Sequence, residues 1–146
     1  MSDLPGKTKL LNFFTINDAW RLVDLPGYGY AHTAKSTRED FNTAVRDYLG
    51  HRANLRHVFV LIDSRHAPSE IDLRFVHWLG RQPVPFALIF TKVDKQAAHH
   101  TRNTIDQFRQ AMARSTDVRP PTFATSAETK TGRAEILAFI AQHLAN

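Results

Sequence analysis

The sequence predicts an α/β fold in which helices wrap a mostly parallel sheet. Residues 57–63 and 85–91 are continuous apolar runs, which are typical of strands buried on both faces of a sheet. Helical apolar spacing follows each run, and this alternation of strand and helix favours parallel pairing. The 146 residues, of which 42% are hydrophobic, are enough for a single domain over residues 1–146.

The first expected element is an antiparallel hairpin. Residues 9–16 and 19–25 have strand-like patterns, and the Asn17-Asp18 pair between them suits a tight turn. We therefore expect one antiparallel edge strand beside the parallel strands.

The remaining elements are helices and one further short strand. Ser36 and Ser69 each stand three residues before an acidic residue, as in a capping box, which predicts two helix starts. Apolar residues at helical spacing predict four helices in all, over residues 36–52, from about 69 to 79, 100–114 and from about 132 onward. The expected apolar stripe of the second helix is Ile71, Phe75, Trp78 and Leu79. That of the last helix is Ile136, Leu137, Ile140 and Leu144. A short strand is expected at residues 121–125.

The charge of the chain is basic. Nineteen Lys and Arg against fourteen Asp and Glu give a net charge of +5 and a pI near 9.9. This excess suits a polyanionic partner such as RNA or a nucleotide, and it is equally compatible with an ordinary solvated surface.

The composition also excludes several classes of protein. There is no cysteine, which rules out disulfides and thiolate zinc sites, and eight scattered histidines have no regular ligand spacing. The first thirty residues lack the apolar stretch of a signal peptide, and the apolar runs are too short to cross a bilayer. We expect a cytoplasmic protein without a membrane partner.

Polar residues follow three of the expected strands, at the edge where parallel sheets bind ligands. The first group is Asp24, Leu25, Pro26 and Gly27. An aspartate at a strand tip can hold Mg²⁺ through water, and a following glycine lets a backbone N–H approach a phosphate. A DxxG pattern occurs by chance in many proteins, so it does not identify a nucleotide site by itself.

The second group is Thr91, Lys92, Val93 and Asp94, directly after an apolar strand. The Asp94 carboxylate can accept hydrogen bonds from both N1–H and N2–H of guanine, while the stem of Lys92 packs across the base. Adenine offers no such pair of donors, so a site of this kind prefers guanine.

The third group is Thr125, Ser126 and Ala127, a turn of small residues whose backbone N–H groups can meet the guanine O6. Each group alone is compatible with ordinary loop chemistry. Their order along the chain, each at the end of an apolar strand, favours one shared guanine nucleotide.

The chain resembles the EngB family of bacterial GTPases. The resemblance runs through PGKT, LLNFF, DLPGYGYA, VLIDSRHAP, WLG, VPFALIFTKVDK and TSAETKTGRAEIL, and so covers nearly the whole chain. It implies a three-layer P-loop GTPase fold that binds GTP and GDP with Mg²⁺. It also implies a monomer that acts with the ribosome or rRNA in large-subunit assembly, and that is needed for cell division and septation.

Gly6, Lys7 and Thr8 match the last three positions of a phosphate-binding P-loop, but the residues before and after them do not fit that motif. The pattern GxxxxGK[ST] would need a glycine where Met1 stands, and a strand rather than a helix follows. The resemblance instead makes this segment the family's switch I, in which Thr8 binds Mg²⁺ beside the water-linked Asp24. Lys9 stands where the family has glutamine. The nucleotide-contacting residues implied here are Gly6, Lys7, Thr8, Lys9 and Leu10.

Relative to the family, the first strand, the P-loop and the first helix are absent from these 146 residues. We therefore expect a domain truncated at its amino terminus, with weak nucleotide affinity. The alternative is a degenerate module that binds no nucleotide and contacts rRNA or a ribosomal partner through its basic surface.

Hydrolysis is expected to be slow. GTPases of the Ras kind place a glutamine after DxxG to orient the attacking water, and Tyr28 stands there in this chain. No catalytic residue is identified from the sequence. Residues 63–66, DSRH, are interpreted as a structural loop after a strand.

Overall fold

The structure, a computed structural model, describes residues 11–25, 27, 43 and 45–144. These fall into two compact units, residues 1–53 and 54–146, and each unit is described by itself.

The first unit contains the expected hairpin. Strand β1, Asn12–Ile16, pairs antiparallel with β2, Trp20–Asp24. Asn17 and Asp18 turn the chain with φ of 52° and 53°, a left-handed backbone that these two residue types tolerate well. The predicted hairpin is confirmed over the described residues.

The first unit also contains helical residues 45–51, in the later part of the first expected helix. The start of that expected helix lies outside the described residues. The ring of Tyr48 contacts Phe13 of β1 edge to face, with ring centroids 6.4 Å apart. The guanidinium of Arg52 lies over both rings, at 5.1 Å from Tyr48 and 5.4 Å from Phe13.

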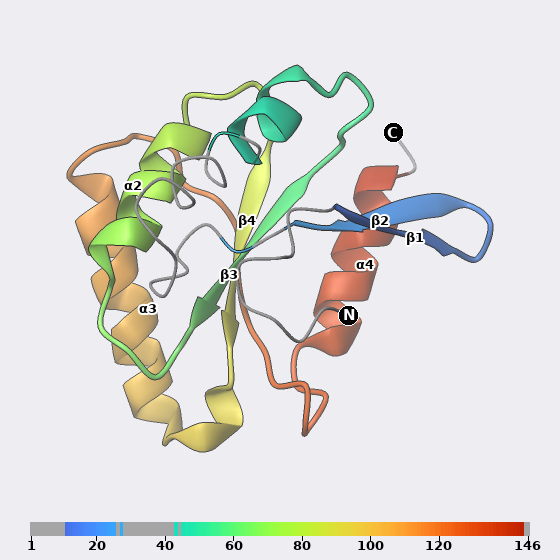
Figure 1. The fold of residues 1–146 in the computed structure, drawn as a ribbon. Helices are drawn as coiled ribbons and strands as arrows, with labels where there is room; N and C mark the ends of the chain where they lie inside the picture. The colour runs from blue at the N-terminus through green and yellow to red at the C-terminus, as the bar shows by residue number, and fades with distance from the viewer. Residues whose placement is uncertain (1–10, 26, 28–42, 44, 145–146) are drawn as a thin grey trace, which may run out of the picture. The chain divides into compact units, whose positions relative to one another are not determined.

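The second unit is built on a parallel sheet. Its strands are β3, Val58–Asp63, β4, Phe86–Thr91, and β5, Thr122–Ala124, in the order β3-β4-β5. The pairing aligns Asp63 with Thr91 and Phe90 with Ala124. The three strands therefore end at one edge of the sheet, the lower edge in Figure 1.

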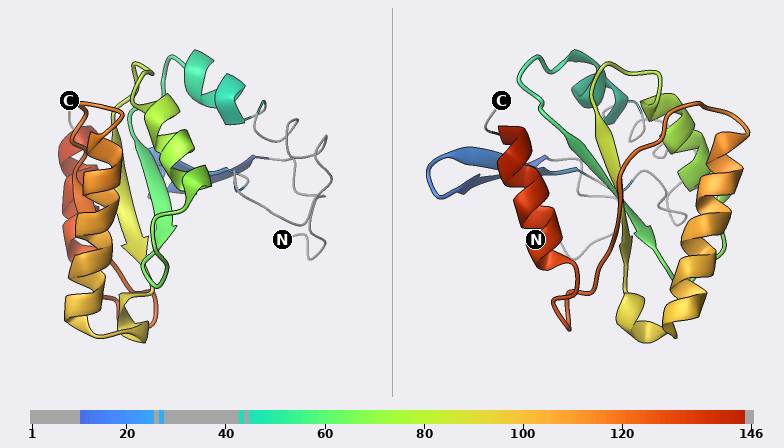
Figure 2. Two further views of the ribbon diagram at one scale, coloured as in Figure 1. Left: turned by 90° about the vertical axis from the view of Figure 1, so that its left-hand side faces the viewer. Right: turned by 180° about the vertical axis from the view of Figure 1, so that it is seen from behind.

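Helices cover both faces of this sheet. Helices α2, Glu70–Leu79, and α3, Ala98–Ala113, lie on one face, and α4, Arg133–Leu144, lies on the other (Figure 1). The right-hand view of Figure 2 shows the same arrangement from behind. The α/β architecture, with a parallel sheet and one antiparallel pair, agrees with the fold class predicted from the sequence.

Helix α2 begins as its sequence predicts. The Ser69 hydroxyl accepts a hydrogen bond from the backbone N–H of Asp72 at 3.0 Å, which satisfies one of the donors left free at a helix start. Val76 and Leu79 are fully buried, whereas Ile71 of the expected apolar stripe is 39% exposed. The buried face is therefore centred one position away from the predicted one.

The two apolar runs differ in burial. Every residue of β4 from Phe86 to Phe90 is buried, as predicted for a strand covered on both faces. For β3 the prediction was wrong, because Leu61 is 63% exposed. Phe59 and Leu61 lie on the same face of β3. Helix α4 covers that face at Phe59, whose ring lies 5.9 Å from that of Phe139, and leaves Leu61 exposed.

An aromatic ring of helix α4 packs against the sheet. The ring of Phe139 contacts Phe59 of β3 and Phe123 of β5, with centroids 5.9 Å and 5.3 Å away. Leu137, which belongs to the expected stripe, is 50% exposed. The sequence pattern located this helix and missed the side chain that anchors it. Among the described residues, no helix is both long enough and apolar enough to cross a membrane.

Candidate functional site

The loop after β4 carries the predicted base-reading carboxylate. Lys92 has a φ of 62°, and this left-handed residue turns the chain from the strand into a short 3₁₀ helix, η1, Val93–Lys95. Asp94 is the second residue of η1 and lies one turn beyond the strand end. Local backbone geometry thus places Asp94 at the carboxyl edge of the sheet.

Backbone hydrogen bonds join this loop to the end of β5. The N–H of Thr125 donates to the carbonyl of Phe90 at 2.8 Å, and the N–H of Val93 donates to the carbonyl of Thr125 at 3.1 Å. These two bonds continue the parallel pairing past the strand ends. The predicted second and third groups of site residues are therefore brought together.

Asp94 and Ser126 contact each other directly. The Ser126 hydroxyl donates to Oδ1 of Asp94 at 2.7 Å and accepts from the backbone N–H of Thr129 at 3.1 Å. Ser126 is buried, at 3% exposure. Its hydroxyl holds the pKa of Asp94 below the ordinary value, so the carboxylate is ionised at neutral pH. One carboxylate oxygen is thereby fixed and the orientation of the other is set.

The structure distinguishes among the backbone N–H groups of the turn at Thr125, Ser126 and Ala127. The N–H of Ser126 donates to the carbonyl of Thr131 at 3.2 Å. Among the described residues, the exposed Ala127 has no acceptor for its amide. Ala127 is therefore the member of this group whose N–H best fits a ligand oxygen.

A glycine closes the same loop. Gly132 has a φ of +79°, and a Cβ there would lie 2.3 Å from the carbonyl oxygen of Ala124. The loop after β5 folds back on its own strand at this point, which requires the absence of a side chain. Gly132 was not predicted as a site residue, although a glycine between a loop and a helix is a usable signal.

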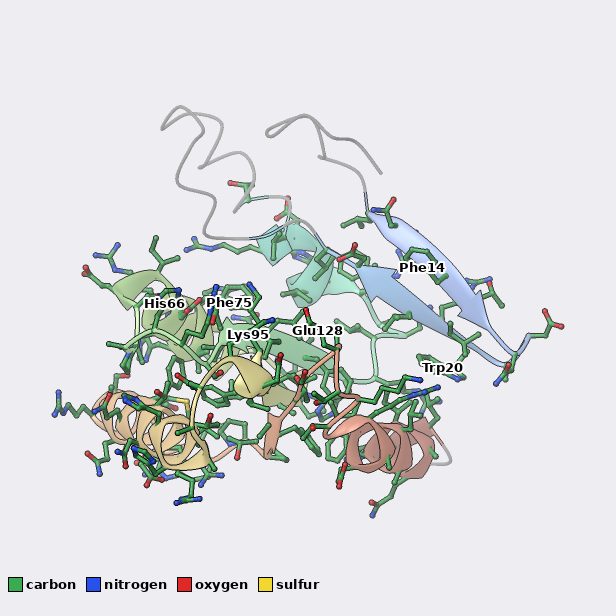
Figure 3. All side chains as sticks on the ribbon, turned by 90° about the horizontal axis from the view of Figure 1, so that it is seen from below. Phe14, Trp20, His66, Phe75, Lys95 and Glu128 are labelled. Atoms are coloured by element: carbon green, nitrogen blue, oxygen red, sulfur yellow. The ribbon has the colours of Figure 1, made fainter. Side chains whose placement is uncertain are left out.

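An ion pair spans the two loops. Nζ of Lys95 lies 3.1 Å from Oε2 of Glu128 and 3.5 Å from Oδ2 of Asp94. Figure 3 views this edge of the sheet and places the two labelled side chains, Lys95 and Glu128, next to each other. The carboxylate of Glu128 raises the pKa of Lys95, which keeps the amine charged.

A second charged cluster lies at the end of β3. Asp63 accepts hydrogen bonds from the backbone and side chain of Arg65, and its Oδ2 lies 3.3 Å from Nζ of Lys92. The hydrogen bonds from Arg65, and then those from Lys92, hold the pKa of Asp63 well below its ordinary value. The sequence interpretation treated residues 63–66 as a structural loop and missed this link to Lys92.

The side chain of Gln96 makes a hydrogen-bond network beside this cluster. The amide nitrogen of Gln96 donates to the carbonyl of Ser64 at 2.7 Å and to the hydroxyl of Thr101 at 3.1 Å. Ser64 and Thr101 are both buried. The chain after η1 is thus anchored to the end of β3 as well as to β5.

The remaining predicted site residues belong to the first unit. Asp24 ends β2 and is exposed, as is Gly27, while Leu25 is half-buried. Pro26 lies outside the described residues, as do all five residues predicted for switch I, namely Gly6, Lys7, Thr8, Lys9 and Leu10.

The described residues are compatible with a water-ligated Mg²⁺ at Asp24. An exposed carboxylate offers an oxygen ligand, and Mg²⁺ keeps several waters when a protein binds it through one or two side chains. The part of the chain that the structure describes holds no group of three or more His, Cys, Asp or Glu side chains placed to bind a metal.

Comparison with known proteins gives the family. A family model described as 50S ribosome-binding GTPase matches residues 1–92. Proteins named "Probable GTP-binding protein EngB" are 45% identical in Porphyromonas gingivalis and 44% identical in Bacteroides thetaiotaomicron, each over 139 residues. These matches cover 95% of this chain and 69% of each relative.

Solved structures share the fold at low identity. Elongation factor SelB from Methanococcus maripaludis, in complex with the GTP analogue GppNHp, superposes with a TM-score of 0.70 at 19% identity over 93% of this chain. The cytosolic domain of the FeoB iron transporter from T. maritima, in its GMPPNP form, gives 0.59 at 19% identity over 93% of the chain. This chain spans 28% of the SelB chain and 49% of the FeoB chain.

The fold and these matches together define a domain of the GTPase class. Several relatives cover almost the whole chain at more than 40% identity and carry the same name. The chain belongs to the EngB family of GTP-binding proteins.

Proposed function

We propose that this chain carries the guanine-reading part of a GTP-dependent switch that acts in assembly of the large ribosomal subunit. The observation that carries the proposal is the 2.7 Å contact between Ser126 and Asp94, made across the ends of two neighbouring parallel strands. It presents an ionised, oriented carboxylate where a guanine base is expected. The family's name and the description of the matching family model support this choice of ligand and partner.

In the proposed site, each group has a chemical task. Asp94 accepts from N1–H and N2–H of guanine, the stem of Lys92 covers the face of the base, and the amide of Ala127 donates to O6. Thr91, Val93, Thr125 and Ser126 hold these three groups in place. Because a carboxylate without its two donors would be strongly penalised, adenine is excluded.

The phosphate side of the proposed site rests on the resemblance. Asp24, through water, and Thr8 would hold Mg²⁺, and residues 6–10 and 24–27 would respond to the terminal phosphate. The ion would supply charge neutralisation at the phosphates. Hydrolysis is expected to be slow because Tyr28 stands where Ras-type GTPases have glutamine, so we propose a switch more than a turnover enzyme.

The proposed setting is the cytoplasm, with the protein acting as a single-domain monomer on the ribosome or its rRNA. The net charge of +5 supports a polyanionic partner. Loss of the protein would then impair ribosome supply and, through it, cell division and septation. The same charge supports the second candidate, a module that binds rRNA without any nucleotide.

The test is a titration of the ¹⁵N-labelled 146-residue chain with GDP and, separately, with ADP, each to several millimolar. We expect GDP to shift the amide signals of residues 91–95 and 125–127, and ADP to leave them in place. Equal shifts of these amide signals with GDP and with ADP would contradict the proposal. No response to GDP, combined with binding to rRNA fragments, would favour the nucleotide-free module.

A further inference from the structure

The segment at residues 63–66 has no task in the function proposed above, although its contacts reach the base site. The carboxylate of Asp63 lies at the end of β3, where the cationic side chains of Arg65 and Lys92 and the ring of His66 approach it. Arg65 donates through its backbone N–H at 3.0 Å and through Nη2 at 2.8 Å. Nζ of Lys92 lies 3.3 Å from Oδ2 of Asp63, and Nε2 of His66 lies 3.8 Å from it.

The link between Asp63 and Lys92 follows from the sheet register. Asp63 pairs with Thr91, so the residue after Thr91 leaves the sheet beside the Asp63 carboxylate. The left-handed backbone of Lys92, with its φ of 62°, fixes where the side chain starts. A lysine side chain has four rotatable bonds, and an anchored ammonium removes much of that freedom.

The two lysines beside Asp94 are paired with different carboxylates. Lys92 pairs with Asp63, while Lys95 pairs with Glu128 and approaches Asp94 at 3.5 Å. Without Asp63, the ammonium of Lys92 would lose its described ion partner two residues away from Asp94. It would then be attracted to the carboxylate that the proposed function assigns to the base.

Arg65 has a separate part in this cluster. Its Nε lies 3.0 Å from Oδ1 of Asp63 and its Nη2 lies 2.8 Å from Oδ2, so the guanidinium grips both oxygens side by side. A two-point contact of this kind fixes the plane of the carboxylate. Oδ2 is thereby directed to the side on which Lys92 approaches.

We propose that Asp63, oriented by Arg65, is a positioning residue for the base site. It holds the ammonium of Lys92 toward β3, so that the lysine stem lies ready for the face of the base and Asp94 stays open to guanine. The inference rests on the proposed function, because it needs Asp94 to be the group that reads the base.

The test is a double-mutant cycle on GDP affinity, measured by the same NMR titration of the full 146-residue chain. The variants are Asp63→Asn, Lys92→Met and the double variant, of which Lys92→Met keeps an apolar stem and removes the charge. We expect Asp63→Asn to weaken GDP binding about three- to five-fold, the scale of a partly exposed ion pair. In the Lys92→Met background the same change has no further effect, because residues acting through one another are not additive.

The matched control is Glu70→Gln, which removes the exposed ion pair between Glu70 and Arg74 on α2. It should leave GDP affinity unchanged. Asp63→Glu keeps a carboxylate and should recover part of the affinity lost in Asp63→Asn. Should Asp63→Asn fail to fold, Arg65→Gln tests the same link, with a smaller loss expected in the same direction.

The outcomes distinguish a failure of the proposed function from a failure of the inference about Asp63. If the unchanged chain does not distinguish GDP from ADP, the proposed function is wrong and this inference falls with it. If the chain distinguishes them, and Asp63→Asn either binds GDP normally or weakens it equally with and without Lys92, then Asp63 is a structural residue and the inference alone is wrong.

Discussion

At the scale of single residues, the site depends on a few polar side chains whose partners are far away in sequence. Asp94 and Ser126 are 32 positions apart, and Asp63 and Lys92 are 29 apart. The first pair was predictable, because both residues lie within three positions of the ends of apolar strands that a parallel sheet must align. The second was not, because Asp63 meets Lys92 only through the register that pairs it with Thr91.

The first prediction concerns the choice of base. Asp94→Asn replaces one acceptor oxygen by an amide that donates, so the side chain no longer matches N2–H of guanine. It matches xanthine instead, which carries a carbonyl oxygen at that position. We expect Asp94→Asn to bind XDP in preference to GDP, measured by parallel NMR titrations.

Ser115→Ala, on a hydroxyl that donates to the carbonyl of Met112, is the control and should keep the preference for GDP. An Asp94→Asn chain that still prefers GDP would show that the carboxylate does not read the base.

The second prediction concerns pH. His57 packs against the rings of Phe59, Phe139 and His143 at 5.2, 4.9 and 5.0 Å, and neither of its ring nitrogens has a hydrogen-bond partner among the described residues. Burial, and then the charge of His143 on α4, lower the pKa of His57 to about 4. The unfolded chain therefore binds a proton more readily than the folded one between about pH 6.5 and pH 4.

The free energy of unfolding should accordingly fall as the pH drops through that window. His57 as a whole is only half-buried, so solvent screens part of the effect. We expect a loss on the order of 1–2 kcal/mol, measured by urea denaturation at a series of pH values. His57→Phe should flatten the curve there. His99→Gln, at an exposed position on α3, should leave it as it is. A curve as steep in His57→Phe as in the parent chain would rule out this histidine as the cause.

At the scale of helices and strands, the sequence patterns located the strands and α-helices of the second unit to within a few residues, but they did not predict the short 3₁₀ helix η1. They located the strands and α-helices because apolar residues recur at a different spacing in strands than in helices, and because Ser69 marks a clear helix start. They did not identify which face each element buries. Leu61 and Leu137 have the same apolar character as buried residues, and the spacing of apolar residues does not show which of them a neighbouring element covers.

The third prediction tests the fold of the loop after β5. Gly132→Ala puts a methyl group 2.3 Å from the carbonyl oxygen of Ala124 and a side chain on a residue with a φ of +79°. We expect a loss of at least about 2 kcal/mol in the free energy of unfolding. Urea denaturation measures it, and GDP affinity should fall with it because Ser126 lies in the same loop.

Gly80→Ala is the matched control. This glycine ends α2 with a φ of −62°, and an added Cβ would meet its nearest atoms at 3.4 Å, an ordinary contact. Its effect should stay within about 1 kcal/mol. Equal effects of the two substitutions would mean that the turn at Gly132 is not tight.

At the scale of the whole molecule, the affinity of these 146 residues for nucleotide follows from what they contain. They hold no GxxxxGK[ST] pattern, which in P-loop proteins supplies backbone N–H groups and a lysine to the phosphates. Losing three such charge-assisted hydrogen bonds costs on the order of 5 kcal/mol, or more than a thousandfold in affinity.

The fourth prediction is therefore a weak, base-selective interaction. We expect the 146-residue chain to bind GDP with a dissociation constant in the roughly millimolar range, measured by NMR titration or by displacement of a fluorescent analogue. Guanosine should bind nearly as well as GDP, since the base makes the contacts. A sub-micromolar constant for GDP would contradict this prediction.

The hydrogen bonds that join Thr125 to Phe90 and Val93 to Thr125 make the carboxyl edge of the sheet a continuous network. A ligand seated on that edge would restrain two chain segments more than thirty residues apart at the same time. Amide hydrogen exchange at both strand ends should then slow together when guanosine is added, as a single cooperative event.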